Sequence, residues 1–153
     1  MKLFALSLVI LAAACGSKPP VSQPTPTGEG SARIALPDVA FEQLDHDQRI
    51  EFMKQKVVPV MKPIFQNHDA KDFAAFGCDT CHGKQAKDGH FDMPNPDLPK
   101  LNFSDLSKFK KQDLEWMGKE VEPAMGKILG LELYSESNPT GFGCLACHTQ
   151  EGK

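Results

Sequence analysis

The feature that most constrains this chain is a heptapeptide that occurs twice. Residues 76–82 read FGCDTCH and residues 142–148 read FGCLACH. Two cysteines separated by two residues and followed at once by histidine are typical of a c-type haem attachment site. The chemistry explains the spacing, because each thiol adds to one vinyl group of the porphyrin and a tight helical turn holds the sulfurs at that separation. We therefore predict two covalently bound haems c.

The motifs assign a role to each of their cysteines and histidines. The cysteines would carry the thioether bonds, and the histidine after them lies under the iron and supplies the proximal ligand through an imidazole nitrogen. The predicted attachment residues are Cys78, Cys81, Cys144 and Cys147, and the predicted proximal ligands are His82 and His148. Zinc-binding Cys-x-x-Cys knuckles are an alternative, but they do not require an adjacent histidine.

The N-terminus indicates export. Met1 and Lys2 precede a twelve-residue apolar run from Leu3 to Ala14, which is too short to span a bilayer and is typical of a secretory signal. The run ends before Cys15 in a sequence that resembles a bacterial lipoprotein signal. We expect residues 1–14 to be removed and Cys15, the one cysteine outside the two motifs, to carry a lipid.

A tether and one folded domain follow. Residues 15–36 are rich in Pro, Ser, Thr and Gly, so we expect a disordered, flexible spacer behind the lipidated cysteine. We assign residues 37–153 to a dihaem domain with units at 41–92 and 104–149. The predicted location is the periplasmic side of a Gram-negative envelope, and Gly16 after the cysteine favours the outer membrane.

Two amphipathic helices are predicted, one in each unit. From Asp45, a plausible N-cap, apolar residues recur at helical spacing, and a similar helix should begin around residues 104–108. Pro59 should kink or break the first helix, since proline removes a backbone donor. We expect an extended loop between Gly83 and Asn102. The predicted apolar stripes are Ile50, Met53, Val57, Met61 and Ile64, and Leu114, Met117, Val121, Met125 and Ile128.

These helices are copies of one another. A shift of 64 positions superimposes Met53 on Met117, Pro59 on Pro123 and Met61 on Met125, and the haem motifs match at a shift of 66. The predicted fold is therefore all-α, a duplicated unit of helix, turn and haem-attachment helix. We expect the two copies to form a pseudo-twofold pair that packs haem against haem.

The repeat also limits the choice of the distal iron ligand. Little follows His148, so the second haem must take its ligand from upstream, and the first haem by analogy. Two methionine pairs remain, although methionine on an apolar helix face is usually core filler. We favour Met61 and Met125, which lie nearer their motifs. The alternative pair is Met53 and Met117, and the sequence alone does not decide between them.

With these residues in place, the chain resembles a multihaem cytochrome c of the photosynthetic reaction-centre cytochrome-subunit type. In that family a helix carries the methionine ligand, a turn follows, and a second helix carries the Cys-x-x-Cys-His motif. The family type has four haems and this chain has two motifs. The resemblance implies an all-α electron carrier outside the cytoplasm.

We therefore expect an electron-transfer protein that is not an enzyme and that exchanges electrons with extracytoplasmic redox proteins. Charge is ordinary, with 17 basic and 20 acidic residues, and shows no basic patch for nucleic acid. The alternatives are a small dihaem peroxidase-like enzyme and a haem-based sensor, both with an open distal site. We also expect the haem-free chain to be largely unfolded, because each unit offers a thin core.

Overall fold

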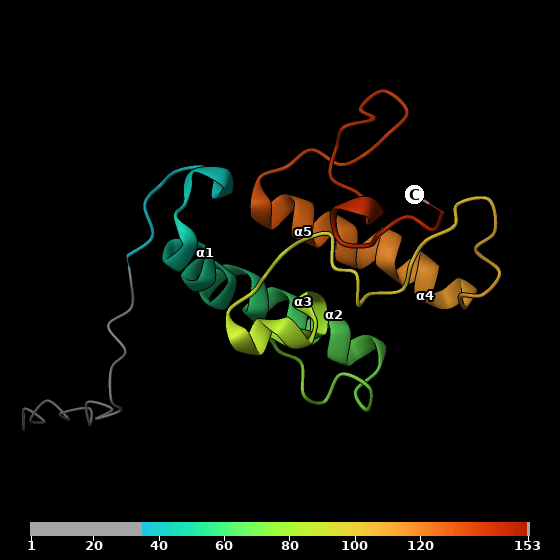
Figure 1. The fold of residues 1–153 in the computed structure, drawn as a ribbon, viewed down its shortest axis with the longest axis horizontal. Helices are drawn as coiled ribbons and strands as arrows, with labels where there is room; N and C mark the ends of the chain where they lie inside the picture. Colours follow the sequence, from blue (N-terminus) through green and yellow to red (C-terminus); the bar gives the residue numbers. More distant parts are fainter. Residues whose placement is uncertain (1–34, 153) are drawn as a thin grey trace, which may run out of the picture. The chain divides into compact units, whose positions relative to one another are not determined.

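The structure is a computed structural model that describes residues 35–152. The chain divides into two units, Met1–Ser31 and Ala32–Lys153, and only the second is described (Figure 1). The expected signal peptide, Cys15 and nearly all of the tether lie outside the described residues. Residues 35–152 contain helices and isolated β-bridges but no strand, so the all-α class is confirmed. None of these helices is long and apolar enough to cross a membrane.

The first long helix consists of three consecutive helical segments. These are α1 (His46–Phe52), a π-helical segment (Met53–Val57) and α2 (Val58–His68). Asp45 caps the start, as predicted: its carboxylate accepts from the Gln48 backbone N–H at 2.9 Å, and the Gln48 side chain accepts from the Asp45 N–H at 3.0 Å. This reciprocal pair satisfies two backbone donors that a helix start otherwise leaves free.

The second long helix is built from the same three kinds of helical segment. It consists of α4 (Lys111–Trp116), a π-helical segment (Met117–Val121) and α5 (Glu122–Leu129). The predicted start around residues 104–108 is wrong. Asn102 and Asp105 each accept a hydrogen bond from the backbone N–H two residues on, at 3.0 and 2.9 Å. These side-chain turns compete with helical bonding and delay the helix to Lys111.

Pro59 and Pro123 do not end their helices, so of the predicted kink or break at Pro59 the break is wrong. The Val58 N–H donates to the Met53 carbonyl and the Glu122 N–H to the Met117 carbonyl, each five residues back. A proline ring crowds the carbonyl four residues before it. The wider π turn immediately before Pro59 and Pro123 accommodates that ring, so the helix changes type and continues.

The two long helices pack against each other and run antiparallel (Figure 1). His68 at the end of α2 lies against Asp113 and Trp116 in α4. The core between the helices is small, as expected. Only six apolar side chains of the described part are buried, and four of them form this cluster: Val57, Met61, Phe65 and Trp116, with Leu44 and Leu101 elsewhere.

The remaining segments are short turns and loops. A 3₁₀ turn (Phe41–Gln43) precedes α1, and α3 (Cys78–His82) carries the first motif. The loop expected between Gly83 and Asn102 is confirmed except for a 3₁₀ helix, Lys84–Asp88. The second motif forms only a 3₁₀ turn, Cys144–Ala146, where an attachment helix was expected.

Candidate functional site

The first Cys-x-x-Cys-His motif lies on a single turn with defined ends. Thr80 closes the start, where its hydroxyl accepts from the Gly77 N–H at 3.0 Å. Gly83 closes the end, where its N–H donates to the Asp79 carbonyl at 3.0 Å and its φ is +72°. Only glycine adopts that φ without strain. The motif is therefore a closed unit of one helical turn that leaves Cys78 exposed and Cys81 half-buried.

The second motif begins with almost the same backbone geometry. Gly77 has φ −158° and ψ −166°, and Gly143 has φ −156° and ψ −167°. The His148 N–H donates to the Cys144 carbonyl at 2.9 Å, which completes one helical turn although the α pattern does not continue. A side chain at position 143 would collide with the Tyr134 Cβ, at 2.9 Å from an added Cβ. The glycine that precedes the second motif thus has a structural reason.

The four cysteines of the motifs are free thiols, and Cys147 lies near enough to Cys81 to affect its ionisation. Burial raises the pKa of Cys81 to about 12, and the neighbouring Cys147 thiol adds to the rise. Burial, followed by Cys144, raises the pKa of Cys147 to about 11. The Cys144 thiol donates to a Glu122 carboxylate oxygen at 3.5 Å. The raised pKa values of Cys81 and Cys147 favour the protonated thiol near neutral pH, which is not the state of a catalytic thiolate.

The two motif histidines differ in the hydrogen bonding of their Nδ1 atoms. His148 Nδ1 lies 2.9 Å from the Pro99 carbonyl oxygen. Because a carbonyl only accepts, Nδ1 is the donor, which in the neutral ring leaves the Nε2 lone pair free. His82 Nδ1 is buried and has no hydrogen-bond partner among residues 35–152, and its ring packs edge-on against Phe91 at 5.3 Å. Burial lowers the pKa of His82, against the opposing effect of the Phe91 backbone.

Comparison of the chain with protein-family models, curated proteins and solved structures gave no match.

The candidate methionines lie at the interface between the helices. Met61 is 2% exposed within the buried cluster, and Met53, Met117 and Met125 pack half-buried around that cluster. Phe76, directly before Gly77, also packs there, with its ring 5.0 Å from that of Phe65. The first motif therefore begins at the edge of the core that holds Met61. The assignment of a methionine to either iron stays a prediction.

No three His, Cys, Asp or Glu side chains converge within the described part of the chain to hold a metal ion. A haem iron takes only two axial ligands from a protein, so this finding concerns direct metal sites alone.

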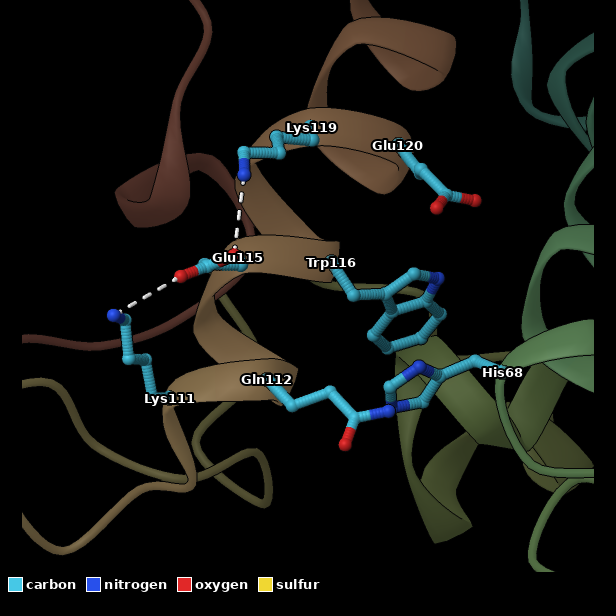
Figure 2. Close-up of a pocket in the computed structure, with 7 residues that line it drawn as sticks. All are labelled: His68, Lys111, Gln112, Glu115, Trp116, Lys119 and Glu120. Atoms are coloured by element: carbon cyan, nitrogen blue, oxygen red, sulfur yellow. Dashed lines mark hydrogen bonds and ion pairs between the residues drawn. The ribbon is translucent and has the colours of Figure 1, made fainter.

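One groove of the described surface is lined by residues of α2, α4 and the π-helical segment after α4, and by no residue of either motif (Figure 2). The His68 ring stacks on Trp116 with the centroids 4.0 Å apart, and its Nε2 contacts the Asp113 carboxylate at 3.0 Å. Figure 2 also shows Glu115 between Lys111 and Lys119, at 3.6 and 3.1 Å. The stack ties α2 to α4 and has a structural role.

Sequence reasoning missed the residues that surround the motifs. Phe91, Asn95 and Pro99 all come from one segment, residues 91–101, which we call the linker. Glu122 at the second motif was also missed. Pro and Asn in the linker indicate a turn, and no local signal indicates that its polar atoms contact both motifs.

Proposed function

We propose that this protein is an electron carrier that holds two haems c, one at each Cys-x-x-Cys-His motif. The observation that carries the proposal is the repeated motif with one backbone geometry at its start, in which His148 directs its Nδ1–H to a carbonyl and leaves Nε2 free. Each free thiol would add across a porphyrin vinyl group, with sulfur bonding to one carbon and the thiol hydrogen passing to the other. No oxidant is needed for that addition.

The residues fit a c-type haem in three respects. The four thiols of the motifs are free, so each is available to form a thioether bond. The exposed Cys78 and Cys144 leave one side of each turn open to a large planar group. Burial lowers the pKa of His82 and so favours the neutral imidazole, which is the form that binds iron.

Bound haem would supply a reversible one-electron ferric–ferrous couple. The chain would set its properties through His82 and His148 on the proximal side and, in our proposal, Met61 and Met125 on the distal side, with Met53 and Met117 as the other pair. Thioether ligation raises the potential relative to two histidines and leaves no open site for a substrate. We also propose that the two halves are copies of one haem-binding unit and that the two haems pack against each other.

We further propose that a lipid on Cys15 anchors the domain on the periplasmic side of the envelope, behind the tether. There the partners would be other extracytoplasmic redox proteins.

The test is purification of the exported protein followed by mass spectrometry and optical spectroscopy. We expect two haems that stay attached in denaturant, a far-red methionine–ferric iron band and no change with CO after reduction. The variant C78S/C81S should retain one haem, and C144S/C147S the other. A high-spin haem that binds CO or peroxide readily would favour the peroxidase or sensor alternative, and a chain without covalent haem would refute the proposal.

A further inference from the structure

The linker lies between the two motifs and hydrogen-bonds to both. Within the linker, Asn95 is 3% exposed and is the buried polar residue of the described part. The Asn95 side-chain Nδ2 donates to the Cys81 carbonyl at 2.9 Å, and the Asn95 backbone N–H donates to the Cys147 carbonyl at 2.9 Å. One residue thus binds the second cysteine of each motif.

The side chain of Asn95 is itself held in place. Its Oδ1 accepts from the Asp97 N–H at 2.9 Å, which fixes the amide orientation and leaves Nδ2 as the donor to Cys81. Gly83, directly after His82, passes so close that an added Cβ would lie 2.9 Å from the Asn95 Nδ2. A buried amide with its polar atoms satisfied on both sides is a rigid connection.

The rest of the linker extends the connection to the histidines and beyond. The Pro99 carbonyl accepts from His148 at 2.9 Å, and Phe91 packs against His82. After Pro99, the Leu101 N–H donates to the Thr149 carbonyl and the Leu101 carbonyl accepts from Glu151, both at 2.9 Å. Both histidines therefore contact the same eleven-residue segment, one near each end.

We propose that the linker sets the position of one haem relative to the other, with Asn95 as the positioning residue. This inference rests on the proposed function, since it concerns the mutual orientation of the groups on the two motifs. The duplication alone does not supply such a link, because the linker occurs once and lies between the copies. In this proposal the linker holds the two motifs as one rigid body. This matters because electron exchange between two haems depends on their distance and orientation.

The experiment compares holoprotein variants at two asparagines of the same region. Asn95→Ala removes both side-chain hydrogen bonds, and Asn95→Leu removes them while filling the space. Asn102→Ala is the matched control, because among residues 35–152 the Asn102 side chain accepts a hydrogen bond only from the nearby Ser104 N–H, at 3.0 Å. Three quantities are measured: covalent haem content, hydrogen exchange at the amides of residues 95 and 101, and the bisignate Soret circular dichroism that two haems give in a fixed mutual orientation.

We expect both Asn95 variants to carry two haems. Their amides at positions 95 and 101 should exchange roughly 10- to 100-fold faster, as the loss of a buried hydrogen bond implies. The bisignate band should shrink to less than half, while Asn102→Ala matches the unmodified protein.

Several results would overturn the inference. Faster exchange with an unchanged Soret band would make Asn95 merely structural, and an unmodified protein with two haems but no bisignate band would show that their orientation is not fixed. Loss of haem from both Asn95 variants but not from Asn102→Ala would indicate a role in maturation in place of positioning. A preparation of the unmodified protein without covalent haem would refute the proposed function as well, so the two failures are distinguishable.

Discussion

Substitutions of Met61 test the proposed iron ligand directly, because its packing role and its iron-binding role can be separated. Its side chain is 2% exposed among Val57, Phe65 and Trp116. Truncation to alanine at such a site costs about 2–5 kcal/mol of unfolding free energy, whereas leucine, of similar volume, costs less than about 1.5 kcal/mol. Met61→Leu therefore keeps the packing and removes only the thioether.

The assay combines urea denaturation of the ferric holoprotein with its optical spectrum and potentiometry. If Met61 binds iron, Met61→Leu should lose the far-red band of one haem and change its potential. Met125→Leu should do the same to the other haem. A packing role alone predicts an unchanged spectrum and a fall in the unfolding free energy of less than about 1.5 kcal/mol. Met93→Leu is the control, because Met93 is an exposed methionine of the linker.

Two results would refute the reasoning. If the spectra of Met61→Leu and Met125→Leu are unchanged while Met53→Leu and Met117→Leu lose the band, the ligand pair is the other one. If Met61→Ala costs less than about 1 kcal/mol, the side chain does not belong to the core in the way the structure places it.

Three further predictions follow from the core, the thiols and Glu122. Trp116→Ala should cost about 3–5 kcal/mol in urea denaturation, because the ring is buried and packs on Phe65 and His68; a cost below about 1 kcal/mol would contradict this role. In haem-free chain at pH 8, all cysteines of the motifs should react with iodoacetamide at similar rates, because we expect that chain to be unfolded. Strong protection of Cys81, whose pKa of about 12 in the folded chain leaves roughly one thiolate in 10⁴, would show that the fold persists without haem. Glu122→Gln should raise the potential of the second haem alone in a redox titration, because the carboxylate lies 3.5 Å from Cys144 and its charge favours ferric iron. Glu120→Gln, an exposed neighbour, should have no effect, and an equal shift of both haems would refute the assignment.

Features encoded locally could be predicted from the sequence. The start of the first helix depends on Asp45 and Gln48, three residues apart, and the structure forms that cap as expected. The apolar stripe likewise placed Val57 and Met61 on the buried face. The cap depends on neighbours within one turn, for which sequence spacing is a direct guide, whereas the stripes missed the core residues Phe65 and Trp116.

Features that depend on distant residues could not be predicted. The contact of Asn95 with Cys147 joins positions 52 residues apart, and nothing in the composition of the linker specifies it. The start of the second helix was misjudged because Asn102 and Asp105 use backbone donors that the helix would need. The assignment of haem, ligands and anchor depends on chemistry outside the polypeptide, and these remain predictions.

The π segments change how the faces of both long helices must be counted. An α-helix advances about 100° per residue, and a π turn takes in one residue more than an α turn. Each π-helical segment therefore rotates the side chains that follow it about the helix axis by about 100°, relative to an uninterrupted α-helix. Residues 53–57 set the direction in which Met61 and Phe65 point, and residues 117–121 do the same for Met125. Deleting one residue from either segment would turn those side chains away from the partner helix without altering the composition of either stripe.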